Sequence, residues 1–204
     1  IIGYGKMGKK IEQISIERGH TIGFKINSQN TEKLNTHCIS KVDLAIEFSG
    51  PQHAFKNISF CLENNIPVVS GTTGWLAQMN DIQLFCEKNN GTLFYAENFS
   101  IGLNIFLKTT QILTQLTRFR NYKIELTETH HKSKKDTPSG TALMLQKTVN
   151  ELNKQQKTPI FSRRLGDVIG EHNLEYSSQE DTITLKHSAH NRDGFAKGAI
   201  LAAE

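Results

Sequence analysis

The stretch that decides the fold is Ile1-Ile2-Gly3-Tyr4-Gly5-Lys6-Met7-Gly8, in which a G-x-G-x-x-G pattern follows an apolar strand end. Residues 6–18 continue with apolar side chains at helical spacing, and residues 21–26 are typical of a second strand. In such units the first glycine permits a tight turn, the second lets backbone approach a pyrophosphate, and the third lets helix and strand pack closely. The pattern predicts a dinucleotide-binding loop, and the alternative is a glycine-rich turn with no ligand.

The same strand and helix alternation continues through the first half of the chain. Strands are expected at residues 42–48, 66–69 and 92–96, with helices beginning at Pro51 and spanning 75–88. This rhythm predicts a parallel sheet covered by helices.

After Asn98 the pattern changes to a long helix at 101–116, an alternating strand at 122–129, a helix at 140–152 and a hairpin of 174–177 with 182–187. The predicted fold class is α/β, a Rossmann-type parallel sheet domain with a second α+β domain built on an open mixed sheet. We expect residues 1–99 plus 190–204 to form the dinucleotide-binding domain, and residues 100–189 to form the substrate-binding and oligomerisation domain.

Composition excludes several classes of function. The 204 residues are 37% hydrophobic and 22% charged, which is ordinary for a globular protein. A net charge of +4 without a dense basic run predicts an anionic small molecule and no nucleic acid. No apolar run reaches the roughly 20 residues of a membrane helix. Three scattered cysteines predict no disulfide, no metal site and a reducing cytoplasmic location.

The end of the second strand bears on the choice of cofactor. An acid usually stands there to bind the ribose hydroxyl, but this chain has Asn27, with Lys25 two residues earlier. Without a carboxylate a 2′-phosphate is not repelled, and Lys25 could neutralise it. NADH or NADPH is therefore expected, and the alternative for Lys25 is a solvated surface lysine.

The most informative stretch runs from Glu128 to Ala142. Two adjacent histidines, His130 and His131, and three lysines crowd a loop that ends at a helix start. Groups crowded in this way can exchange protons near neutral pH. Ser139-Gly140-Thr141 at the helix start offers backbone N–H groups and a hydroxyl to a carboxylate. The alternative interpretation is a basic surface loop with an ordinary helix cap.

The letters from His130 to Thr141 resemble the H-H-x-x-K-x-D-x-P-S-G-T signature of the 4-hydroxy-tetrahydrodipicolinate reductase (dihydrodipicolinate reductase) family. Gly71-Thr72-Thr73-Gly74 resembles its G-T-T-G loop, and Ala96-Glu97-Asn98-Phe99-Ser100 resembles its hinge segment. Arg192 and Phe195–Ala199 resemble its closing stretch. The resemblances occur in family order and span nearly the whole chain, although Glu97 replaces a residue that is commonly small.

The resemblance implies a role for each matching residue. His130 is the acid/base histidine and Lys134 the proton-donating lysine, while His131, Gly140 and Thr141 contact substrate. The cofactor-binding positions are Gly3, Tyr4, Gly5, Lys6, Met7, Gly8, Asn27, Gly71, Thr72, Thr73, Ala96, Glu97, Asn98 and Phe99. The implied activity is reduction of a small dicarboxylate, 4-hydroxy-tetrahydrodipicolinate, in lysine and diaminopimelate biosynthesis, by a cytoplasmic homotetramer.

Two other functions remain open at this stage. One is a different NAD(P)-dependent dehydrogenase that acts on an imino or amino acid, and the other is a non-catalytic NAD(P)-sensing protein. The remaining side chains receive structural interpretations. Trp75 is expected to pack at a helix start, and Glu12, Glu17 and Glu63 to lie on solvated helix faces. No role is predicted for His20, His37, His53, His172, His187 and His190, which show no ligand spacing.

Overall fold

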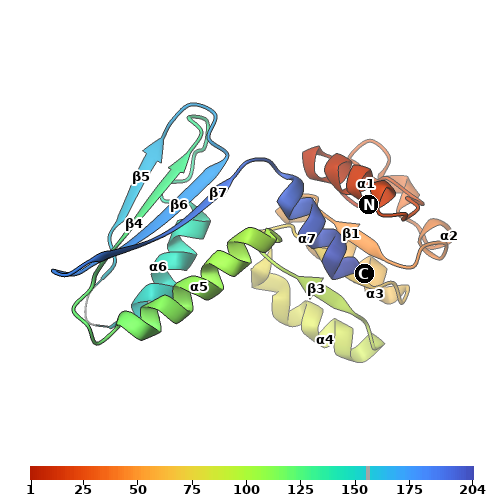
Figure 1. The fold of residues 1–204 in the computed structure, drawn as a ribbon. Helices are drawn as coiled ribbons and strands as arrows, with labels where there is room; N and C mark the ends of the chain where they lie inside the picture. Colours follow the sequence, from red (N-terminus) through yellow and green to blue (C-terminus); the bar gives the residue numbers. More distant parts are fainter. Residues whose placement is uncertain (155–156) are drawn as a thin grey trace. The chain divides into compact units, whose positions relative to one another are not determined.

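A computed structural model describes residues 1–154 and 157–204 and divides the chain into two compact units (Figure 1). The first unit comprises Ile1–Ile101 and Arg192–Glu204, and the second comprises Gly102–Asn191. The chain therefore leaves the first unit once and returns to it for its last helix, α7 (Asp193–Ala203).

The first unit is built on a parallel sheet in the order β1 (Ala45–Glu47), β2 (Val68–Ser70) and β3 (Leu93–Tyr95). Ile2 extends it, because single parallel bridges join Ile2 to Glu47 and to Ile26. The strands predicted at 42–48, 66–69 and 92–96 are present but shorter. The strand predicted at 21–26 is reduced to the bridge at Ile26, whose backbone hydrogen-bonds Ile1, Gly3 and Tyr4.

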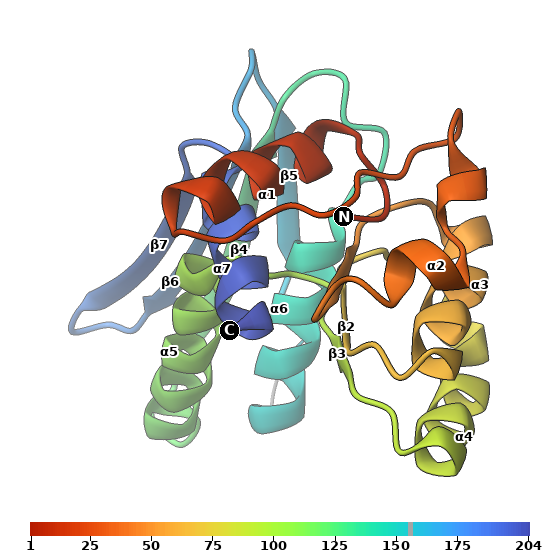
Figure 2. The same ribbon diagram turned by 90° about the vertical axis from the view of Figure 1, so that its right-hand side faces the viewer.

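Helices cover both faces of this sheet, as the alternation predicts (Figure 2). Neighbouring strand residues point to opposite faces. Ile46 packs with α1 (Lys6–Glu17) and α7, whereas Ala45 and Val68 pack with α3 (Pro51–Glu63) and α4 (Met79–Asn89). Burial on both faces explains why these strands are short apolar runs. The helix predicted at 75–88 begins as a 3-10 turn, η2 (Leu76–Gln78), after the buried Trp75.

Two short elements complete the first unit. The 3-10 turn η1 (Thr31–Lys33) and the helix α2 (Thr36–Ile39) connect Ile26 to β1. The side chain of Asn35 caps α2 by accepting a hydrogen bond from the Cys38 N–H.

The second unit contains a mixed sheet in the order β5–β4–β6–β7. β4 (Lys123–His130) pairs in parallel with β5 (Ile160–Arg164) and antiparallel with β6 (Gly170–Ser177), which pairs with β7 (Thr182–Ala189). The predicted strand and hairpin are present, and α6 (Gly140–Leu152) has the predicted bounds. β5 was not predicted, because its second half, Ser162-Arg163-Arg164, is polar on both faces.

One face of the mixed sheet is covered and the other is open. Helices α5 (Ile101–Thr117) and α6 lie on the same side of the sheet (Figure 1). Side chains on their inner surfaces, such as Phe106 and Leu145, form a core with Leu126 and Leu174 of the strands. On the opposite face Phe161 is 49% exposed. No helix in the described parts of the chain is long and apolar enough to span a membrane.

Candidate active site

The segments expected to bind a dinucleotide all follow strands of the first unit. The glycine loop follows Ile2, Gly71–Gly74 follows β2, and residues 96–99 follow β3. The carboxyl ends of parallel strands lie at one edge of a sheet. The chain passes from Ile2 outward to Ile26 and then back across to β1, so the strand order reverses beside Ile2. Nucleotides bind at such a reversal in sheets of this kind.

The three glycines of the loop differ in what surrounds them. Gly3 has a φ of +93°, and a β-carbon there would overlap the Phe48 carbonyl. A β-carbon on Gly8 would overlap the Gly3 carbonyl oxygen, so both glycines serve the chain's own packing. A β-carbon on Gly5 would have no described atom within 4 Å. The open space at Gly5 fits backbone that an external group approaches, as a pyrophosphate would.

The buried side chain of Glu47 ties two of these loops together. It is fully buried, and its carboxylate accepts hydrogen bonds from the hydroxyls of Ser49, Ser70 and Thr72. The Ser49 N–H donates to both Glu47 and the Thr72 hydroxyl, at 3.1 Å and 2.8 Å. Glu47 therefore holds the loop after β1 against the loop after β2. Sequence reasoning did not find this residue, because a glutamate in an apolar strand carries no motif.

The structure corrects two interpretations near the expected ribose position. The Lys25 ammonium lies 2.9 Å from the Glu12 carboxylate, which also accepts a hydrogen bond from the Tyr4 hydroxyl. These two bonds hold the pKa of Glu12 below its usual value. Glu12 is therefore not simply a solvated helix side chain, and Lys25 already has a partner. The Asn27 side chain accepts a hydrogen bond from the Gln29 N–H.

The segment after β3 combines buried and exposed positions. Phe99 is buried against Phe48, with ring centroids 5.7 Å apart, and Glu97 is exposed. The Asn98 side chain accepts a hydrogen bond from the Ser100 N–H at 2.8 Å. Gly71 lies so close to the Phe48 ring that a β-carbon would overlap it. Of the predicted cofactor positions in these loops, Thr72 is buried, while Thr73, Gly5 and Lys6 are exposed.

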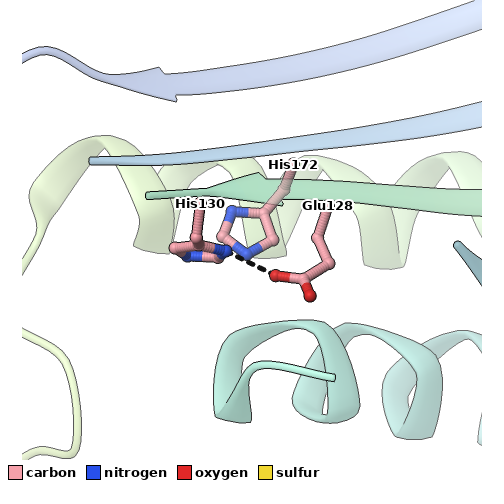
Figure 3. Close-up of side chains that lie close together, drawn as sticks. All are labelled: Glu128, His130 and His172. Carbon is pink, nitrogen blue, oxygen red and sulfur yellow. Dashed lines mark ion pairs between the residues drawn. The ribbon is translucent and has the colours of Figure 1, made fainter. Parts of the chain in front are cut away.

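The second unit gathers three titratable side chains on the covered face of its sheet (Figure 3). Glu128 and His130 lie on β4, and His172 lies directly opposite Glu128 on β6. The His130 Nδ1 is 2.5 Å from a Glu128 oxygen, and the rings of His130 and His172 meet edge to face with centroids 5.3 Å apart. The other Glu128 oxygen is 2.9 Å from the Arg164 guanidinium of β5. All three side chains are buried.

The surroundings shift the pKa values of this cluster. Burial lowers the pKa of His172 to about 4, and the nearby His130 adds to that effect, so the ring is neutral at pH 7. Burial also lowers the pKa of His130, Glu128 opposes that change, and Lys134 and Arg164 support it. Burial favours the protonated form of Glu128, but hydrogen bonds from its neighbours, Arg164 included, hold its pKa below the usual value. The cluster therefore combines an ionised carboxylate with neutral imidazoles.

The other predicted substrate residues lie in the loop between β4 and α6. Lys134 pairs with Asp136 at 2.9 Å, and His131 Nδ1 is 2.8 Å from the Ser133 hydroxyl. Ser139 caps α6 by accepting a hydrogen bond from the Ala142 N–H, and its hydroxyl lies 3.4 Å from His172 Nε2.

The start of α6 is accessible for a ligand. Gly140 is exposed, with open space where a β-carbon would lie, and Thr141 is half-buried. N–H groups at such a helix start suit a carboxylate, and the backbone of Gly140 already helps to lower the pKa of the Asp136 carboxyl.

Sequence reasoning assigned no role to His172, and the structure places its ring against that of His130. Glu128 could have been found, because strict alternation along β4 places residues 128 and 130 on one face. His172 and Arg164 could not, because their positions depend on the register of β6 and β5 against β4.

The same three side chains also have the donor types of a metal site. Ligand atoms of Glu128, His130 and His172 lie within 4.8 Å of one another. However, the carboxylate already faces the Arg164 guanidinium and His130, and a divalent cation would have to compete with both. The arrangement therefore favours proton chemistry over metal binding.

A parallel-sheet unit with a dinucleotide loop, followed by a mixed-sheet unit with a buried histidine cluster, defines a class of two-domain nicotinamide-dependent oxidoreductases. The model named "Dihydrodipicolinate reductase, N-terminus" matches residues 1–99, and "Dihydrodipicolinate reductase, C-terminus" matches residues 102–204. The chain therefore belongs to the dihydrodipicolinate reductase family, whose members use NADH or NADPH.

Individual relatives agree with this assignment. A 4-hydroxy-tetrahydrodipicolinate reductase of Christiangramia forsetii is 39% identical, over 100% of this chain and 90% of its own length. One from Rickettsia rickettsii is 37% identical, over 98% and 88%. A structure titled dipicolinate-bound dihydrodipicolinate reductase, from Paenisporosarcina sp. TG-14, has the same fold. Its TM-score is 0.79 at 24% identity, covering 97% of this chain and 89% of that one.

Proposed function

We propose that this protein reduces 4-hydroxy-tetrahydrodipicolinate to tetrahydrodipicolinate, using NADH or NADPH, in lysine and diaminopimelate biosynthesis. The observation that carries the proposal is the intact segment from His130 to Thr141, placed beside a buried carboxylate in a chain of this family. In this proposal the first unit binds the cofactor and the second binds the dicarboxylate.

The cofactor supplies a hydride when it is bound, and the residues of the chain supply binding and protons. Gly3–Gly8 would hold the pyrophosphate, with Gly71–Thr73 and Ala96–Phe99 along the nicotinamide half. The 4-hydroxyl of the substrate leaves as water, which gives an unsaturated imine. Addition of a hydride to this imine builds negative charge on an atom next to the reduced carbon, and a cation that donates a proton there lowers the barrier. Lys134 fills that role, and His130 serves as the acid/base group of the site. The N–H groups of Gly140 and Thr141 bind one carboxylate, assisted by His131.

Cofactor choice rests on the position of Asn27. A neutral side chain there accepts either a ribose hydroxyl or a 2′-phosphate, and the Lys25 ammonium is already paired with Glu12. We therefore expect both NADH and NADPH to serve, without a strong preference.

The open face of the second sheet supports self-association. Exposed side chains of β5, β6 and β7, such as Phe161, Glu175 and Thr184, lie on a face that no helix in the described parts of the chain covers. We propose that this face joins copies of the chain into a homotetramer, and that the enzyme works in the cytoplasm. Sedimentation equilibrium tests the assembly, and a monomer at micromolar concentration would exclude it.

A coupled assay with freshly generated substrate tests the reaction. NADH and NADPH oxidation are followed side by side, and turnover with either cofactor is the expected result. Turnover only on other imino or amino acids would identify a different dehydrogenase. Binding of NAD(P)H without turnover on any of these substrates would identify a sensor.

A further inference from the structure

The pair of Glu128 and His130 defines which ring nitrogen of the histidine carries its proton. An ionised carboxylate oxygen and a bare ring nitrogen would repel each other at the 2.5 Å that separates them. Glu128 is fully buried and holds the Arg164 guanidinium on its other oxygen, so its ionised form is the favoured one. The proton of neutral His130 must therefore sit on Nδ1, the ring nitrogen next to Glu128.

The opposite nitrogen of the ring faces Gly170. A β-carbon built on Gly170 would lie 3.1 Å from His130 Nε2, which is tight enough to press on the ring. The backbone of Gly170 does not have a positive φ, so the chain path itself does not require glycine there. Closeness to the ring is therefore the physical reason for glycine at this position, and it keeps the Nε2 lone pair uncovered by a side chain.

His172 holds the ring of His130 from the side. It stands opposite Glu128 in the strand register, and its ring meets that of His130 edge to face, with 74° between the ring planes. Its Nε2 lies 3.4 Å from the Ser139 hydroxyl, which links it to the start of α6. The ring is neutral, so it adds shape to the cluster without adding charge.

We propose that Glu128 and His172 are positioning residues, which hold His130 with its proton on Nδ1 and its Nε2 lone pair available to the substrate. Glu128 acts through its close electrostatic contact with Nδ1, and His172 prevents the ring from turning. This proposal rests on the proposed function only in assigning substrate to the Nε2 side.

The charged groups around His130 have opposite effects on its pKa, so a change at Glu128 should be detectable as a change in that pKa. Glu128 on its own strand favours the imidazolium, whereas Arg164 on β5 and Lys134 in the following loop disfavour it. His172 on β6 also faces the ring and is neutral. Removing the negative charge of Glu128 should therefore lower the pKa of His130 further.

The first experiment measures the tautomer directly, by 15N NMR of histidine side chains in the wild-type enzyme without substrate. Above pH 7 the ring of His130 should show a protonated Nδ1 and an unprotonated Nε2. A ring with its proton mainly on Nε2 would overturn the proposal. This measurement needs no turnover, so it stands even if the coupled assay finds no reductase activity.

The second experiment uses variants of the carboxylate. Glu128→Gln should lower kcat by roughly 10²-fold, within the usual range for proton transfer by a side chain, and leave KM within about twofold. The acidic limb set by His130 should move to lower pH, because the working form of the ring is neutral, and Glu128→Asp should regain part of kcat. The control Glu151→Gln, on the exposed side of α6, should behave like wild type. An unchanged pH profile in Glu128→Gln would contradict the assignment.

The third experiment separates shape from chemistry at His172. His172→Phe retains a flat ring and should keep kcat within about threefold, whereas His172→Ala frees the ring of His130 and should lose about tenfold. Equal losses in both variants would show that His172 acts through its nitrogens, and no loss in either would show that it does not position His130. The circular dichroism spectrum and urea midpoint of each variant report whether the second unit is folded.

Discussion

Two glutamates, one in each unit, are fully buried, and their partners differ in kind. Glu47 in the first unit is held by three hydroxyls and a backbone N–H, and among the described residues no cation lies within ion-pair distance of it. Glu128 in the second unit is held by a guanidinium and an imidazole. Neutral donors fix the shape of loops, whereas titratable partners place a proton. This difference agrees with the proposal that the first unit positions a cofactor and the second carries the proton chemistry.

The largest expected effect comes from removing the proposed proton donor of the second unit. Lys134→Ala should lower kcat by roughly 10³-fold, because the proton and the cation are both lost, while NADH binding stays within about twofold of wild type. Stopped-flow oxidation and fluorescence titration of NADH measure the two effects. Lys147→Ala on the exposed face of α6 is the matched control. A kcat equal to that of wild type in Lys134→Ala would contradict the proposal that Lys134 donates the proton.

The next effect concerns the pH dependence of stability in the second unit. The folded pKa of His172, about 4, lies below the unfolded value of about 6.5. Between these values the unfolded chain binds a proton that the folded chain does not, so stability falls as pH falls from 6.5 to 4. The loss should reach at most about 3 kcal/mol. Urea unfolding of His172→Phe should show a correspondingly flatter slope over that window, and an unchanged slope would contradict the burial of this ring.

A smaller effect is expected at the neutral network of the first unit. Glu47→Gln replaces an acceptor by an amide that cannot satisfy three hydroxyls, and should cost about 2 kcal/mol. NADH affinity should weaken as well, because Thr72 loses its partner, while the pH profile of kcat stays unchanged. Urea unfolding and NADH titration measure these changes. A shifted pH profile of kcat in Glu47→Gln would show that Glu47, like Glu128, affects a group that titrates during turnover.

The smallest effect comes from adding a carboxylate where the first unit lacks one. Asn27→Asp should lower the kcat/KM for NADPH relative to NADH by roughly tenfold, because the new charge repels a 2′-phosphate and can bind a ribose hydroxyl. Paired assays with the two cofactors measure the ratio. Gln29→Glu, at an exposed position two residues further on, controls for charge alone. An unchanged ratio of the two kcat/KM values would show that the ribose does not bind beside Asn27.

Much of the local structure could be predicted from the sequence because the signals lie within a few residues. The spacing of Gly3, Gly5 and Gly8 predicted the loop, and alternation along residues 122–129 predicted β4. The cap at Ser139 predicted the start of α6. His130 and Lys134 were predicted from their motif, and their roles remain proposals.

Contacts between distant residues could not be predicted in this way. The partnership of His172 with His130 spans 42 residues of sequence and depends on the antiparallel register of β6 against β4. The pairing of Lys25 with Glu12 depends on how α1 lies against the segment before Ile26. A shift of one residue in the pairing of β6 with β4 would turn His172 to the opposite face of the sheet.

The sequence by itself determined the α/β class, the glycine loop and the segment from His130 to Thr141, because each rests on local periodicity and short-range chemistry. Only the tertiary structure decided that Glu47 joins two loops and that Glu128, Arg164 and His172 surround His130. Burial removes these side chains from water, and a buried charge or ring must be satisfied by whichever neighbours the strand register provides.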